Sequence, residues 1–107
     1  MRNAPDALIT VRLLPSEQGG RQGPTPDRIF RCIMVIDGVN LDVRLNLDRQ
    51  GSLQPGMIRD VEINFLNPEF AKFHVRAGEE FQLRETSIIG SRLVKQTFVR
   101  QPQRHHA

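Results

Sequence analysis

The chain of 107 residues contains neither tryptophan nor tyrosine, and its six aromatic residues are all phenylalanine. Amphipathic rings that commonly stack on nucleic-acid bases are therefore missing, so recognition based on base stacking is disfavoured. The single cysteine, Cys32, cannot form an internal disulfide, and its apolar surroundings predict a small buried side chain rather than a reactive thiol. No apolar segment resembles a signal peptide or a membrane span. We expect a reduced, cytoplasmic protein without membrane contact.

The composition is that of one globular domain. Hydrophobic residues make up 38% of the chain and charged residues 25%, whereas a disordered chain has fewer apolar residues and a larger net charge. A chain of this length buries roughly 65% of its extended surface on folding. The formal net charge of +3 mildly favours an acidic partner such as RNA.

Short apolar or alternating segments, separated by Gly and Pro turns, recur through the sequence and indicate β-strands. They cover residues 7–14, 29–36, 41–47, 58–65, 78–85 and 88–94. Only residues 68–72 suggest a short helical turn, with Pro68 at its first position. We predict an all-β protein with a closed six-stranded antiparallel β-barrel, because closure removes exposed strand edges. Residues 1–6 are assigned to a disordered N-terminal segment, 7–96 to the barrel and 97–107 to a polar basic tail.

Three further features of the barrel follow from the pattern. The nearly continuous apolar run 29–36 predicts a central strand covered on both faces, and residues 73–75 are expected to return to extended structure. Gly78 and Gly90 mark bends or close backbone approaches within their strands. The alternation directs a set of side chains to the interior, namely Val43, Leu45, Val61, Ile63, Phe81 and Leu83.

Four motifs occur in an order that resembles the C-terminal β-barrel of elongation factor Tu. They are a strand followed by Glu17-Gln18-Gly19-Gly20-Arg21, the turn Pro55-Gly56, the segment 78–85 ending in Arg84-Glu85, and a last strand containing Gly90. The resemblance spans about residues 7–96, and stand-alone bacterial proteins of this single barrel are still more similar. It implies the same barrel that the strand pattern predicts.

The resemblance also implies a binding site. In the full-length factor, the loop after the first strand and the Arg-Glu turn both contact the backbone of tRNA. The corresponding residues here are Gly20, Arg21, Gln22, Arg84, Glu85 and Thr86. From the residues alone, the amides of the two glycines before Arg21 could face a phosphate, or the segment could be an ordinary turn with a solvated arginine.

The remaining chemistry favours binding over catalysis. Arg84 and Glu85 are neighbours on a predicted strand and point to opposite faces, so cross-strand ion pairing is the expected role. His74 has no visible orienting partner, and the terminal His105 and His106 lack further metal ligands. There is no phosphate-binding Gly-x-x-x-x-Gly-Lys-[Ser/Thr] loop, which excludes GTP hydrolysis. We therefore expect no enzyme, no metal and no nucleotide or other cofactor.

Two functions remain open at this point. The first is a non-catalytic binding module that recognises RNA backbone, as in tRNA, or a protein of the translation machinery. The alternative is an immunity-type or decoy protein-interaction domain that mimics the elongation factor. A basic face that includes Arg21 would favour RNA, whereas an exposed apolar patch beside the same loops would favour a protein partner.

Overall fold

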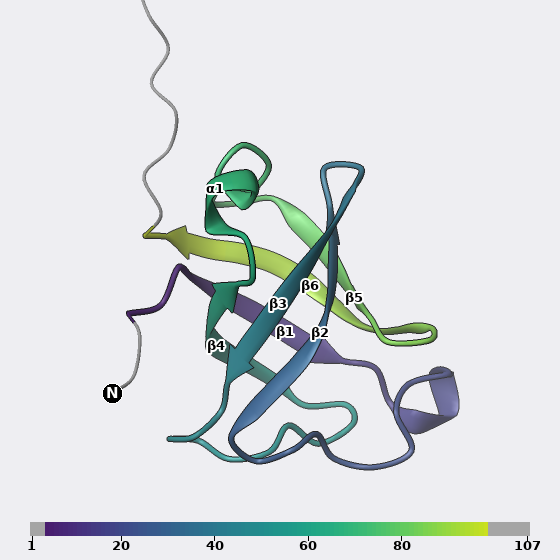
Figure 1. Cartoon of the computed structure of the whole chain (residues 1–107). Coiled ribbons are helices and arrows are strands. Elements are labelled where there is room, and N and C mark those ends of the chain that lie inside the picture. Colours follow the sequence, from purple (N-terminus) through teal and green to yellow (C-terminus); the bar gives the residue numbers. More distant parts are fainter. Residues whose placement is uncertain (1–3, 99–107) are drawn as a thin grey trace, which may run out of the picture.

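A computed structural model describes residues 4–98 of the protein. Its six strands are β1 (Ala7–Leu13), β2 (Ile29–Ile36), β3 (Val39–Asn46), β4 (Ile58–Phe65), β5 (Glu80–Arg84) and β6 (Ile88–Thr97), joined by a 3-10 turn η1 (Ser16–Gln18) and a short helix α1 (Pro68–Ala71). The strands form a closed barrel in the order β1-β4-β3-β2-β5-β6, and all neighbours are antiparallel (Figure 1). The predicted all-β class and closed six-stranded antiparallel barrel are confirmed.

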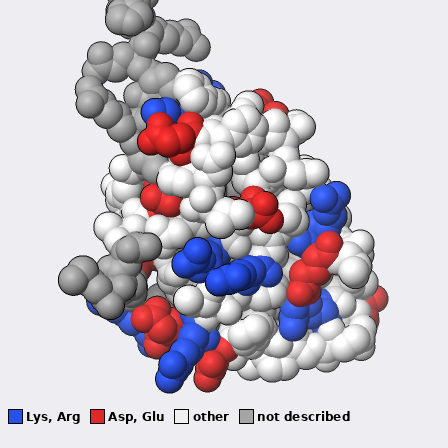
Figure 2. All heavy atoms as spheres, viewed as in Figure 1, with Lys and Arg blue, Asp and Glu red and all other residues white. Residues whose placement is uncertain are grey.

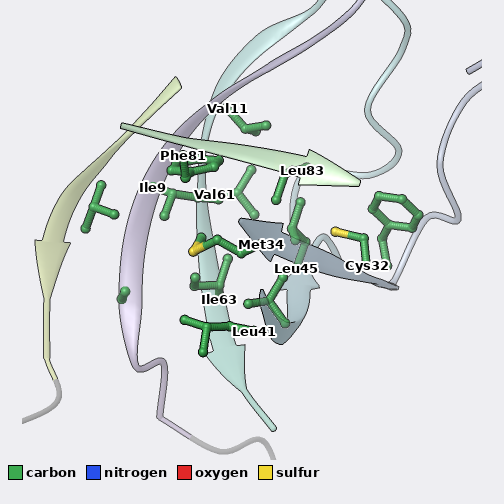
Figure 3. Close-up of a cluster of buried hydrophobic side chains, with 14 of the residues drawn as sticks. Ile9, Val11, Cys32, Met34, Leu41, Leu45, Val61, Ile63, Phe81 and Leu83 are labelled. Atoms are coloured by element: carbon green, nitrogen blue, oxygen red, sulfur yellow. The ribbon is translucent and has the colours of Figure 1, made fainter. Parts of the chain in front are cut away.

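The core is built by the alternation of side chains along the strands. In β1, buried residues alternate with partly exposed ones over the whole strand, as expected where one face lines a barrel interior. All six predicted interior residues are buried, namely Val43, Leu45, Val61, Ile63, Phe81 and Leu83. Side chains from several strands meet in this cluster (Figure 3). Each fully buried side chain of this kind contributes roughly 1.5–3 kcal/mol to stability.

The prediction that residues 29–36 are covered on both faces is wrong. In β2, buried residues alternate with exposed or half-buried ones, and Ile29 is 46% exposed. The outward positions include the exposed Arg31 and the half-buried Ile33 and Val35. The apolar run therefore reflects β-branched residues on the outer surface of the barrel, where no second layer formed by residues 4–98 packs over them.

The segment after β4 forms a short helix and turn. Asn67 caps α1, its side-chain oxygen accepting a hydrogen bond from Phe70 N, as predicted for a helical turn at this position. The expected return to extended structure at residues 73–75 is wrong. The amides of His74 and Val75 both donate to the carbonyl of Ala71, so the chain continues to turn and leads directly into the bend before β5.

The predicted bend at Gly78 and close approach at Gly90 are confirmed, although Gly78 lies before β5 and not within it. Gly78 has a φ of 89°, a conformation that favours glycine, and it lies in the turn before β5. Gly90 lies where β6 passes β1, and a Cβ atom there would be 2.8 Å from the carbonyl oxygen of Arg12. A side chain at Gly90 would therefore separate the two strands.

The ordered chain extends slightly beyond the predicted domain at both ends. The amide of Asp6 donates to Ile63 O at 2.8 Å, and the amide of Phe98 donates to Asp6 O at 2.8 Å. The assignment of Asp6 to a disordered segment is therefore wrong, and Thr97, placed in the tail, belongs to β6. Residues 1–3 and 99–107 lie outside the described part. None of the helices in residues 4–98 is long and apolar enough to cross a membrane.

Candidate functional site

The fold brings together the loop and the turn that the sequence singled out. Arg21 follows η1 in the connection between β1 and β2, and Glu85 lies in the bend between β5 and β6. The Arg21 Nη1 atom donates to both carboxylate oxygens of Glu85, each at 2.6 Å. Residues 64 positions apart thus form one contact at an end of the barrel.

The guanidinium of Arg21 is occupied on several sides. Its Nε donates to Gly23 O at 3.4 Å and its Nη2 to Pro24 O at 3.2 Å. Its Cζ atom lies 5.1 Å from the centre of the Phe30 ring, within the range of a cation–π interaction. The side chain is only 23% exposed. Arg21 therefore fastens the loop to the end of β2 and to the β5–β6 bend.

The hypothesis that the two glycine amides face a phosphate is wrong. The amide of Gly19 donates to Ser16 O and that of Gly20 to Pro15 O, each at 3.2 Å. Glycine is needed at position 20 because a Cβ atom there would lie 2.3 Å from the carbonyl oxygen of Leu14. The sequence Gly-Gly-Arg is thus a tight turn whose amides satisfy the loop itself.

The other predicted site residues border this contact. Gln22 and Thr86 are exposed, and Arg84 is half-buried at the end of β5. Arg84 lies opposite Ile33 of β2. Cross-strand ion pairing was expected for Glu85. Glu85 instead lies outside β5, and its ion pair is with Arg21 in the loop after η1.

A neighbouring feature was not identified in the sequence. Arg31 of β2 lies directly opposite Arg44 of β3, and Arg84 of β5 lies opposite Ile33, two residues further along β2. None of these three arginines forms an ion pair or side-chain hydrogen bond with another residue of the range 4–98. We call these three residues on the outer surface of β5, β2 and β3 the arginine face.

Like charges directly opposite each other on paired strands destabilise a sheet. On the paired outward positions of β2 and β3, the acidic residue is Asp42, opposite Ile33. Figure 2 shows basic side chains side by side in the middle of the surface where β2 and β3 lie in front in Figure 1. Elsewhere in residues 4–98, Arg21, Lys72, Arg76 and Lys95 form ion pairs, whereas the arginines of this face do not.

A hollow of about 390 Å³ accompanies the arginine face. Its lining includes Arg31, Ile33, Asp42, Arg44 and Leu66. Leu66, just after β4, is 69% exposed. The surface therefore combines unpaired guanidinium groups with an exposed aliphatic side chain, an arrangement suited to binding an anionic partner.

Cys32 is buried beneath this region. Burial raises the pKa of its thiol to about 12; the Glu85 charge also raises this pKa, and Arg21 opposes the shift. The thiol is therefore protonated at neutral pH and a poor nucleophile. The predicted small buried side chain is confirmed.

The surroundings of His74 differ from those that the sequence predicted. It is half-buried, and its Nδ1 lies 3.0 Å from Asp37 Oδ2, so it does have an orienting carboxylate. Within residues 4–98, no group of three or more His, Cys, Asp or Glu side chains is arranged to hold a metal ion.

No protein-family model matches the sequence, and no curated protein matches it.

Proposed function

We propose that the protein is a non-catalytic binding module that holds the sugar-phosphate backbone of a structured RNA, such as tRNA, on its arginine face. The observation that carries the proposal is the directly opposed pair Arg31 and Arg44. Such a pair costs stability in the free protein. A phosphate between the two guanidinium groups converts this repulsion into two charge-assisted contacts.

The site implied by the resemblance to elongation factor Tu supports the same surface. Arg84 belongs to that site and also to the arginine face. Next to Arg84, an ion pair holds the loop against the β5–β6 bend, with 2.6 Å between Arg21 Nη1 and Glu85 Oε1. In this proposal Arg21 acts as a positioning residue that fixes the exposed Gln22 and Thr86 beside the ligand. The lack of Trp and Tyr fits recognition of the RNA backbone better than stacking of its bases.

A protein of the translation machinery is the second candidate, and a domain that mimics the elongation factor to bind such a protein belongs to the same class. The observation that favours it is Leu66, which is 69% exposed at the border of the arginine face. Apolar anchors surrounded by polar residues are typical of protein interfaces. A protein partner would need acidic residues for Arg31 and Arg44 and an apolar pocket for Leu66.

The RNA proposal is tested by measuring the affinity for an unmodified tRNA between 50 and 200 mM salt, for the parent and for the double variant Arg31→Ala/Arg44→Ala. Loss of two phosphate contacts lowers the slope of log K against log salt by roughly 1.8 units on a duplex stem. The matched control is Lys72→Ala/Arg76→Ala, which removes the same net charge from residues that already pair with Glu69 and Glu79.

The control should leave the slope close to that of the parent. If both double variants reduce the slope equally, binding depends on net charge and the arginine face has no special role. If the parent binds no tRNA at 50 mM salt, the RNA proposal is refuted. Binding to a purified elongation-factor partner that requires Leu66 would then support the second candidate.

A further inference from the structure

One carboxylate lies beside the arginine face without a partner of its own. Asp42 of β3 is exposed and lies two residues from Arg44 on the same side of the strand. It lines the hollow of about 390 Å³ together with Arg31 and Arg44. Within residues 4–98, the Asp42 side chain forms no ion pair or hydrogen bond with another residue. The carboxylate and the arginines beside it are therefore all available to a ligand.

The position of Asp42 is fixed from both sides of its strand. It lies opposite Ile33 of β2, and its carbonyl accepts a hydrogen bond from Leu66 N at 2.9 Å. Ile33 is half-buried and Leu66 is 69% exposed, and both line the same hollow. The carboxylate therefore belongs to a paired part of the sheet with an aliphatic side chain on either side. A position fixed in this way lowers the ordering cost of binding.

A carboxylate at this place opposes the binding of a simple anion. Residues two apart on one face of a strand are separated by about 7 Å. A phosphate held by Arg31 and Arg44 would therefore lie within about one Debye length of Asp42 at physiological salt. A carboxylate only accepts hydrogen bonds. Asp42 thus favours a ligand only where that ligand carries a hydrogen-bond donor next to its phosphate.

The backbone of RNA carries such a donor. Each ribose has a 2′-hydroxyl group, which donates and accepts hydrogen bonds and is absent from DNA. The phosphate oxygens of both nucleic acids act as acceptors. A hydrogen bond from a hydroxyl to a carboxylate is charge-assisted and roughly twice as strong as one between neutral groups. Within a nucleic-acid backbone, the 2′-hydroxyl is therefore the group that satisfies Asp42.

We infer that Asp42 accepts a hydrogen bond from the 2′-hydroxyl of a ribose next to the phosphate that Arg31 and Arg44 hold, and so makes the arginine face selective for RNA over DNA. This inference rests on the function proposed above and adds a specificity-determining residue to it. Ile33 and Leu66 supply the apolar surface against which the ribose packs. The arginines cannot supply this selectivity, because a guanidinium group binds the phosphates of RNA and DNA alike.

The competing explanation is that Asp42 only offsets the repulsion between Arg31 and Arg44. The two explanations differ in the sign of the effect on RNA. If Asp42 has only this electrostatic role, its removal takes a negative charge away from the phosphate and strengthens the binding of RNA and DNA together. If Asp42 holds the 2′-hydroxyl, its removal weakens RNA binding and leaves DNA binding unchanged or stronger.

The test compares three hairpins of one sequence, each titrated with the full chain at about 50 mM salt. They are RNA, RNA with 2′-fluoro riboses throughout its stem, and DNA. The fluorine atom keeps the A-form helix and is similar in size to the hydroxyl, but it has no proton to donate. The parent should bind RNA at least about tenfold more tightly than either other hairpin. In Asp42→Ala the affinities for RNA and 2′-fluoro RNA should become equal. Asp42→Asn, whose amide oxygen still accepts a hydrogen bond, should keep part of the preference.

The matched control is Glu80→Ala, because Glu80 is an exposed residue of β5 that does not line this hollow. It should keep the preference of the parent. Arg31→Ala/Arg44→Ala should weaken the binding of all three hairpins. Each variant must retain the dispersed amide spectrum of the parent.

Two results would overturn the role of Asp42 and leave the proposed function standing. One is equal affinity of the parent for RNA and 2′-fluoro RNA while binding still depends on the arginine pair. The other is tighter RNA binding by Asp42→Ala, which would show that the carboxylate only repels the phosphate. A parent that binds none of the hairpins would refute the proposed function, and the inference would fall with it.

Discussion

Replacing Arg21 with alanine tests the role that the structure gives to this side chain. The change removes the contact with Glu85, two hydrogen bonds to the carbonyls of Gly23 and Pro24, and the interaction with the Phe30 ring. The loop between β1 and β2 then loses its attachment to the β5–β6 bend. We expect a less stable barrel with a locally loosened loop.

The magnitude follows from the separate contacts. Glu85 is 34% exposed, so solvent screening limits the ion pair to about 0.5 kcal/mol. The cation–π contact adds about 0.5–1 kcal/mol. The two long bonds to carbonyl groups together contribute about 1 kcal/mol. Arg21→Ala should therefore reduce the free energy of unfolding by about 2 kcal/mol.

The assay is urea unfolding, read as a lower midpoint at unchanged slope. Glu85→Gln should cost less than about 1 kcal/mol, because it removes only the weak ion pair. Arg49→Ala is the control, since Arg49 is exposed and forms no ion pair with another described residue. The reasoning is refuted if Arg21→Ala is as stable as Arg49→Ala, or if Glu85→Gln costs as much as Arg21→Ala.

The same variant separates a positioning role from a direct phosphate contact. If Arg21 contacted an RNA backbone, as the resemblance to elongation factor Tu implies, its loss would lower the salt slope by about one unit. In the structure, its donors are already occupied by Glu85, Gly23 and Pro24. We therefore expect Arg21→Ala to weaken tRNA binding with little change in slope.

Two further predictions concern the core and one surface charge. Phe81→Ala, at a position 3% exposed, should cost about 3–5 kcal/mol in urea unfolding; a variant as stable as the parent, or a far-UV spectrum dominated by helix, would contradict the barrel core. A hydrogen bond from Lys95, the larger effect, and one from Thr10 lower the pKa of Asp60. The ionised Asp60 therefore stabilises the fold at pH values above its pKa in the unfolded chain. This stabilisation is lost as the pH falls through the lower pKa of Asp60 in the folded protein. Lys95→Ala should raise the pKa of Asp60 in an NMR titration, and an unchanged pKa would show that the Lys95 contact at 2.6 Å has no effect in solution.

The barrel was predictable because the sequence signals for its strands and turns are local. Alternation assigns inward positions such as Leu45 and Ile63, and the turn residues Asp37 and Gly38 separate two strands clearly. The predictions failed where the local sequence pattern does not determine what packs against a segment. An apolar run such as 29–36 can be covered by a second layer or can lie on the outside of a barrel. A segment as short as 73–75 follows the hydrogen bonds of its neighbours, here the carbonyl of Ala71.

The site was only partly predictable. The contact between Arg21 and Glu85 joins distant segments and was not predicted; the resemblance to a known barrel implied only that the loop and the Arg-Glu turn belong to one site. The opposed pair Arg31 and Arg44 could have been found from the sequence. A two-residue turn at Asp37 and Gly38 fixes the hairpin register, and counting back five residues from Ile36 and forward five from Val39 gives this pair.

The partial pairing of β3 with β4 could not have been predicted in the same way, because it depends on how the strands are staggered around the barrel. Stagger is set by closure of the whole sheet, and it leaves β4 beside only the second half of β3. Inward side chains fill the interior of a small barrel, and here all six strands contribute buried apolar residues. In the function proposed above, the ligand therefore binds on the outer surface. On that outer surface, stability alone favours neither the opposed pair Arg31 and Arg44 nor an exposed Leu66, and the proposed binding surface includes all three residues.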